Sequence, residues 1–116
     1  MSFKIQKKDR YTLIKTNVEK LDTTVAPTLK SELVLLNADG VQNIIIDLSA
    51  SRYCDSSGLS AILVANRLCK NANGILVLTG LQDPVRNLIA ISQLGSILNI
   101  YVTLEESIRK VNGTEE

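Results

Sequence analysis

The chain has 116 residues, of which 45% are hydrophobic and 22% are charged, and this composition is typical of one globular domain with one core. Its formal net charge of +1 favours neither nucleic acid nor an anionic membrane surface, so we expect no nucleic-acid partner. The sequence has no histidine, which excludes Ser-His and Cys-His nucleophile pairs and most zinc sites.

Other absences narrow the chemistry and the location further. No G-x-x-x-x-G-K-[ST], G-x-G-x-x-G or G-x-S-x-G motif occurs, so we expect a non-enzyme without cofactor or metal. Charged and polar residues interrupt every apolar run and no secretory signal is recognisable, so we expect no direct membrane insertion. Cys54 and Cys69 form no C-x-x-C pair and are typical of free thiols in a reducing cytosol, which predicts a cytoplasmic protein.

Two short strands are expected at the start of the chain. They cover residues 3–7 and 11–17, and the polar residues Lys8, Asp9 and Arg10 between them indicate a hairpin turn. Residues 18–22 are expected to form a loop.

A helix follows this loop. Asp22 or Thr23 can cap it, Pro27 fits its first turn, and Gly40 is suited to the position just after its end. Its apolar face recurs at helical spacing and consists of Val25, Leu29, Leu33 and Leu36.

Strands and helices alternate through the rest of the chain. The apolar run at 43–48 is typical of a strand buried on both faces of a parallel sheet. We then expect a helix over 59–70, a strand over 75–78, a helix that Asp83 caps and Gly95 ends, a strand over 99–102 and a helix over 104–111. The alternation predicts a single α/β domain over residues 1–112, with an N-terminal β-hairpin followed by parallel strands joined by α-helices in a mixed sheet, and a frayed tail over 113–116.

The stretch Asp55-Ser56-Ser57-Gly58 falls between a strand and a helix. Free backbone N–H groups and the positive end of the helix dipole meet at such a turn, so it is a suitable place for a serine phosphate. Each residue also has a purely structural interpretation. Asp55 or Ser56 can be the N-cap, Ser57 can supply the cap hydroxyl, and Gly58 can relax the first turn or admit another chain.

Four stretches, in this order, resemble the STAS domain family, which includes sulfate-transporter tails and anti-sigma factor antagonists. They are Leu21-Asp22 with Ala26-Pro27 and Leu29, Ile44 to Leu48 with Cys54 to Leu59, Leu76 to Gly80 with Val85 to Leu88, and Ile91 to Leu98. Two positions differ from the family pattern. Glu19 and Lys20 stand where the family often has Gly-Glu, and Cys54 stands where an apolar residue is more usual.

The resemblance implies a bacterial signalling protein that regulates transcription. It implies that Ser56 is phosphorylated by a partner that is both a serine kinase and an anti-sigma factor. The unphosphorylated form then binds that partner and frees the sigma factor, the phosphorylated form lets go, and a separate phosphatase restores the first state.

The helix after this motif has apolar residues on two sides. One side carries Leu59, Ile62 and Leu63, and the other carries Ala61, Val64, Ala65 and Leu68. Because a two-layer domain covers only one side, we expect a partner to contact the helix beside the serine, through Asp22, Leu59, Ala61, Val64 and Leu68. The alternative is that the C-terminal helix or a second copy of the chain covers the other side.

Other functions stay open at this point. The chain can be a STAS scaffold, without phosphorylation, in a transporter or a stress-signalling assembly. It can also be a small-molecule or nucleotide sensor, since loops at the C-terminal ends of parallel strands often bind ligands. Asp22 and Asp47 can be paired catalytic carboxylates, but we favour structural roles, with Asp47 at a strand end and Asp22 at a helix start.

Overall fold

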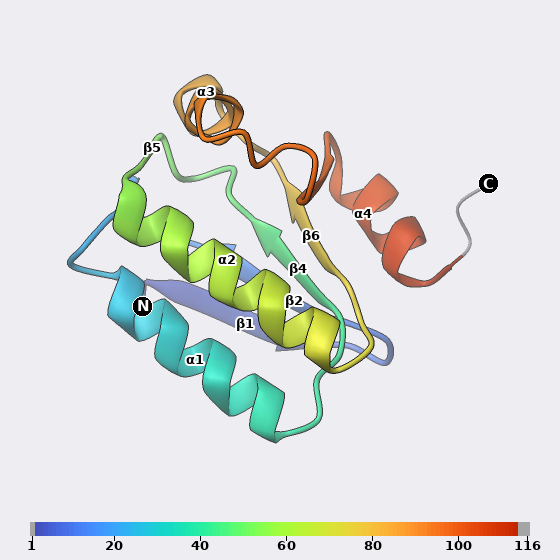
Figure 1. Cartoon of the computed structure of the whole chain (residues 1–116). Helices are drawn as coiled ribbons and strands as arrows, with labels where there is room; N and C mark the ends of the chain where they lie inside the picture. The colour runs from blue at the N-terminus through green and yellow to red at the C-terminus, as the bar shows by residue number, and fades with distance from the viewer. Residues whose placement is uncertain (1, 114–116) are drawn as a thin grey trace.

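The computed structural model describes residues 2–113 (Figure 1). Its strands are β1 (Phe3–Lys7), β2 (Thr12–Thr16), β3 (Lys20–Leu21), β4 (Ile44–Asp47), β5 (Tyr53–Cys54), β6 (Leu76–Thr79) and β7 (Asn99–Tyr101). Its helices are α1 (Ala26–Ala38), α2 (Ser56–Asn71), α3 (Asp83–Ile91) and α4 (Leu104–Val111). The expected tail over 113–116 lies outside the described residues except for Gly113.

The main sheet confirms the predicted fold class. Its order is β1-β2-β4-β6-β7, in which β1 and β2 form the antiparallel hairpin and the remaining neighbours are parallel. β4 and β6 lie in the middle of this sheet and are almost wholly buried, which explains why their sequences are continuous apolar runs rather than alternations.

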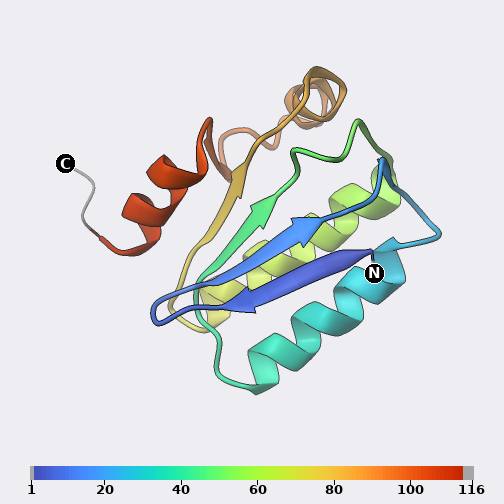
Figure 2. The same cartoon turned by 180° about the vertical axis from the view of Figure 1, so that it is seen from behind.

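Helices cover both faces of the sheet, so the domain has three layers. Figure 1 shows α1 and α2 side by side on one face, where they share a core that includes Ile14, Leu33, Ile46 and Ile62. On the other face α4 packs its Val111 against a smaller cluster with Ile45 and Val77. Figure 2 shows that α4 covers the β6 and β7 side of that face, while β1 and β2 have no helix in front of them.

The expectation that α2 leaves one apolar side uncovered is wrong for Ala61 and Ala65, although Val64 on that side stays half-buried. α1 packs against α2, and the small residues Ala61 and Ala65 are completely buried. The C-terminal helix does not cover α2, because α4 lies on the opposite face of the sheet. The hypothesis failed because it assumed two layers and did not pair the two helices on one face.

The first helix is capped differently from the prediction. Its N-cap residue is Val25, which makes no side-chain cap. The carboxylate of Asp22 instead accepts hydrogen bonds from the hydroxyl of Thr24 at 2.6 Å and from its backbone N–H at 3.0 Å. Asp22 therefore closes a turn before the helix. The hydroxyl of Thr23 does not cap the helix either, because it contacts Asp55 and Ser57. At the other end Gly40 adopts a φ of +86°, as expected for the residue after a helix.

The third helix also differs at both ends. Asp83 is already inside α3 and forms an ion pair with Arg86 at 3.1 Å, so it does not cap the helix. α3 ends at Ile91, and the left-handed residue that follows is Gln93, with φ 61°, rather than Gly95.

Candidate functional site

The Asp55-Ser56 turn is held by a small second sheet that the sequence did not predict. β3 and β5 pair in parallel, with Lys20 beside Tyr53 and Leu21 beside Cys54. The backbone N–H of Asp55 continues this contact by donating to Leu21 O at 3.3 Å. The loop before α1 and the loop before α2 are thus joined at the end of the domain where β4 finishes.

Asp55 is the N-cap of α2. Its Oδ1 accepts a hydrogen bond from the backbone N–H of Gly58 at 2.9 Å, and its Oδ2 accepts one from Thr23 Oγ1 at 3.3 Å. Ser57 does not cap the helix, since its Oγ lies 3.4 Å from Thr23 Oγ1 instead. Asp55 therefore satisfies the first turn of α2 and ties it to the loop before α1.

Ser56 is the first residue of α2 and is exposed. Its hydroxyl makes no hydrogen bond to any part of the chain that the structure describes. It stands at the N-terminus of a helix of 16 residues, where the helix dipole favours a negative group. The helix start thus leaves the Ser56 hydroxyl accessible and does not depend on it.

Gly58 permits a close approach within the chain itself. A Cβ at this position would collide with the backbone oxygen of Leu21 and would lie only 2.8 Å from Cys54 Sγ. The packing of β3 against the start of α2 therefore explains why residue 58 is a glycine, without reference to another chain.

Cys54 packs under the same turn. Its Sγ donates to Asp55 O at 3.4 Å, and the side chain contributes to the edge of the core. Burial, followed by the charge of Asp55, raises the pKa of the Cys54 thiol to about 11, so at neutral pH the group is an uncharged thiol.

A hollow of about 400 Å³ adjoins the turn and is lined by Lys20, Asp22, Tyr53, Cys54 and Asp55. Tyr53 is 46% exposed, and its ring centroid lies 5.9 Å from Lys20 Nζ and 5.7 Å from Arg52 Cζ. Tyr53 was not predicted from the sequence to belong to the site. An aromatic residue two positions before Asp55, in a chain with 3% aromatic residues, is the signal that was available.

The residues that were predicted to contact a partner fall into two groups, one buried and one half-buried. Leu59 and Ala61 are buried in the core, so their assignment to an exposed contact surface is corrected. Leu68 is half-buried and packs against the core. Asp22 and Val64 are also half-buried, and Val64 lies on the outer side of α2, two turns after Ser56 and Ser57.

Asp22 and Asp47 each close a local turn through hydrogen bonds to their carboxylates. Asp47 is the last residue of β4, and its Oδ1 accepts a hydrogen bond from the backbone N–H of Ser49 at 2.9 Å. The hydroxyl and the backbone N–H of Thr24 lower the pKa of Asp22 below its ordinary value of 3.8. Among residues 2–113, no group of three or more metal-ligating side chains comes together.

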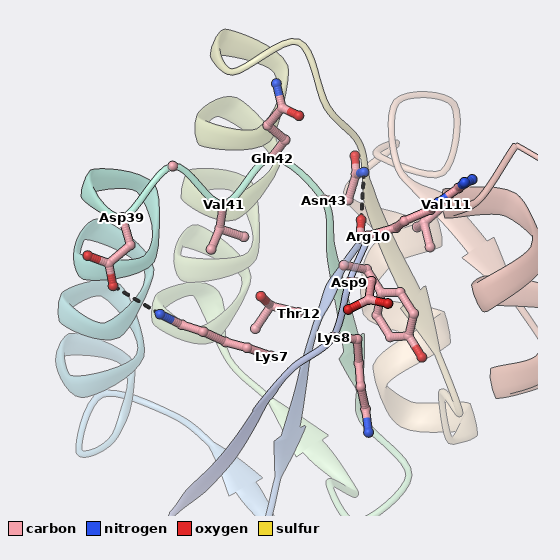
Figure 3. Close-up of a pocket in the computed structure, with 12 residues that line it drawn as sticks. Lys7, Lys8, Asp9, Arg10, Thr12, Asp39, Val41, Gln42, Asn43 and Val111 are labelled. Atoms are coloured by element: carbon pink, nitrogen blue, oxygen red, sulfur yellow. Dashed lines mark hydrogen bonds and ion pairs between the residues drawn. The ribbon is translucent and has the colours of Figure 1, made fainter.

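A second hollow, of about 430 Å³, lies at the opposite end of the sheet, between the β1–β2 turn and the start of β4 (Figure 3). Its polar groups are largely engaged in holding the chain together. Lys7 forms an ion pair with Asp39 at 3.0 Å, and Asn43 donates to Arg10 O at 2.9 Å while accepting from the N–H of Ile75 at 3.0 Å. This hollow is remote from Ser56, and we assign it a structural role.

Within residues 2–113, no helix combines the length and the apolar character that crossing a bilayer requires.

Comparison with known proteins places this arrangement in a family. A family model described as STAS domain matches residues 2–107. The structure of the anti-sigma factor antagonist SpoIIAA in its unphosphorylated form is similar, with 23% identity, a TM-score of 0.84, and coverage of 98% of this chain and 99% of that chain. The phosphorylated form of SpoIIAA, a Bacillus cell fate determinant, matches with 23% identity and a TM-score of 0.74, over 94% and 98% of the two chains.

Two further structures have the same fold. A putative anti-sigma factor antagonist from Thermotoga maritima is 22% identical, with a TM-score of 0.88 over 95% of this chain and 94% of that chain. The murine anion transporter Slc26a9 is 12% identical, with a TM-score of 0.77 over 93% of this chain but only 18% of the transporter. A comparison with curated protein sequences found no match.

Proposed function

The chain belongs to the STAS domain family, and we propose that it is an anti-sigma factor antagonist controlled by phosphorylation of Ser56. The main support for this proposal is that the cap of α2 and the candidate phosphorylation site are different residues. Asp55 caps the helix through Gly58, so the neighbouring Ser56 hydroxyl is exposed and free to accept a phosphoryl group. The fold of SpoIIAA, which is known in unphosphorylated and phosphorylated forms, supports it.

Phosphorylation of Ser56 would act on binding more than on folding. A phosphoserine carries about −1.5 to −2 charges at neutral pH, and the helix N-terminus offers that charge a favourable position. A partner seated on the same surface would meet the new charge directly beside Asp55. We therefore expect the unphosphorylated form to bind an anti-sigma factor that is also a serine kinase, and the phosphorylated form to dissociate from it until a phosphatase removes the phosphate.

The contact surface that we propose surrounds Ser56 on the outside of the domain. It combines Asp22 and Tyr53, which line the adjacent hollow, with Val64 on the outer side of α2. Leu68 lies at the margin of this surface because it packs mainly inward. In this proposal the domain is a cytoplasmic binding module and not an enzyme.

The test is phosphorylation by the cognate kinase. Incubated with that kinase and ATP, the protein should gain one phosphate, and Ser56→Ala should abolish the gain. Ser57→Ala is the matched control, because Ser57 is the next hydroxyl on the same turn and should leave phosphorylation intact. A phosphate that survives Ser56→Ala, or that maps to Ser57, contradicts the proposal.

A second candidate is a STAS scaffold in which the serine is not modified, and the likeness to part of Slc26a9 favours considering it. A pull-down with wild type and Ser56→Asp separates the two. Loss of the partner with Ser56→Asp supports the switch, whereas equal capture by both proteins supports the scaffold.

A further inference from the structure

The outer edge of β1 carries backbone groups that pair with no described part of the chain. β1 ends the sheet order, and no described strand lies beyond it (Figure 2). The turn bonds from Asn17 N to Ser2 O and from Lys8 N to Tyr11 O, together with the β1–β2 register, fix which residues face β2. Because hydrogen-bonded pairs alternate along an antiparallel ladder, Lys4 and Gln6 bond to β2, and the N–H and C=O groups of Phe3, Ile5 and Lys7 point outward.

We propose that β1 pairs with β1 of a second copy of this chain, antiparallel and with the two-fold axis at Ile5. Ile5 then lies opposite Ile5 of the other copy, and Phe3 lies opposite Lys7. All of these residues have outward backbone groups, so each pair makes two hydrogen bonds. The sheets of the two copies join into one continuous sheet.

The charges of β1 select this register. In the register centred on Ile5, Lys4 faces Gln6 of the other copy. Sliding the strands so that the axis falls on Lys4 places Lys4 opposite Lys4, and an axis on Gln6 places Lys4 opposite Lys8. Like charges directly opposite one another destabilise a strand pair, so the charges favour the register at Ile5 over these two alternatives.

The apolar side chains agree with the same pairing. Ile5 is half-buried and packs against the core beside α1, so contact with its symmetry mate removes more of its surface from water. A strand of five residues buries little area, so we expect a weak dimer whose population rises with concentration. Lysines on an edge strand often keep a protein monomeric, and that is the competing outcome of the test.

Sedimentation velocity from micromolar to millimolar protein is the first measurement, and we expect a monomer–dimer equilibrium. Ile5→Pro removes the outward N–H without breaking a bond to β2, so it should abolish the dimer. Ile5→Ala is the matched control, since it retains that N–H, and it should weaken the dimer less. Circular dichroism should show that both variants stay folded.

The register has its own test. Gln6→Glu faces Lys4 of the other copy and should strengthen the dimer several-fold, while Gln6→Lys should weaken it by a similar factor. The same two changes at Ser31, exposed on α1, control for net charge and should leave the equilibrium unchanged.

Crosslinking tests the position of the axis. Paired Ile5 residues would have Cα atoms about 5.5 Å apart, within disulfide range, so Ile5→Cys should give a crosslinked dimer on oxidation. Lys15→Cys, exposed on the interior strand β2, should not. A protein that stays monomeric at all concentrations overturns the proposal. So does a dimer that Leu35→Glu, on the exposed face of α1, dissociates while Ile5→Pro leaves it intact.

Discussion

Thr16 and Ser51 form a buried hydroxyl pair, with 2.7 Å between Thr16 Oγ1 and Ser51 Oγ. Ser51 donates its hydrogen to Val18 O at 2.7 Å, so Thr16 is the donor within the pair, in preference to its longer contact with Asp47 O at 3.4 Å. The pair joins the end of β2 to the loop that leads into β5 and the Ser56 turn. Two completely buried hydroxyls thus fix the route of the chain into the candidate site.

Removing Ser51 should destabilise the domain more than removing Thr16. Ser51→Ala leaves both Val18 O and the Thr16 hydroxyl without this partner, and we expect a loss of about 1–3 kcal/mol in the free energy of unfolding. Thr16→Val removes one donor, and we expect a loss of about 1 kcal/mol. Urea unfolding monitored by circular dichroism measures both. Equal losses would show that the pair does not hold the loop in this way.

Asp55 and Ser56 should differ sharply in their effect on stability. Asp55→Ala removes the cap of α2, and we expect a loss of about 0.5–2 kcal/mol. Ser56→Ala touches an exposed hydroxyl without a partner in the described chain, so the change should stay within about 0.5 kcal/mol. Thermal unfolding of the two variants measures both losses of stability. A large loss with Ser56→Ala would mean that Ser56, and not Asp55, supports the helix start.

Gly58→Ala should be destabilising although alanine favours helices. Alanine in a helix interior gains about 0.5–1 kcal/mol over glycine. The new Cβ would nevertheless strike Leu21 O and Cys54 Sγ, and overpacking of this kind costs about 1–3 kcal/mol. Gly95→Ala is the control, because its Cβ would meet no atom within 4 Å. Denaturant unfolding that ranks Gly95→Ala as the worse of the two would contradict the packing around Gly58.

The two cysteines should make stability fall at alkaline pH. Burial raises the pKa of both thiols from an ordinary value of 9.0 to about 11 in the folded protein. A raised folded-state pKa means that the folded protein holds the proton more tightly than the unfolded chain. The stabilisation that the protonated thiols give the folded protein is therefore complete below about pH 9 and is lost as pH rises to about 11.

A double variant isolates this effect from lysine and tyrosine titration. Cys54→Ser with Cys69→Ala should lose less stability than the wild type between pH 9 and 11. Parallel curves for the two proteins would show that neither thiol is desolvated. Iodoacetamide gives an independent check, since it should alkylate the folded protein far more slowly than the unfolded chain at pH 9.

Long periodic segments were predictable because burial leaves a regular pattern. The apolar runs that became β4 and β6 and the 104–111 helix were all located from sequence. The helix over 104–111 has both a capping box at Thr103 and Glu106 and charges that suit its dipole, so local signals agreed there.

Features of two or three residues were not predictable in the same way. β3 and β5 have two residues each, too few for any alternation to appear, and they exist because the loops before α1 and α2 meet in space. The expected caps at Asp22 and Asp83 were wrong for a related reason, whereas the expected cap at Asp55 is confirmed. Asp22, Asp55 and Asp83 are equally good caps by residue type, but only Asp55 lies where its carboxylate reaches a free N–H of the next turn.

The position of the Gly58–Asp55 bond has a consequence for residue 56 itself. Because folding does not use that side chain, variants with serine, alanine, aspartate or asparagine at this position should all remain folded, with a small stabilisation of aspartate by the helix dipole. Any difference among such variants in a binding assay then reports on the partner alone, with no correction for unfolded protein. Substitutions at position 56 therefore report on binding, and the residue at this position is determined by the partner rather than by the stability of the fold.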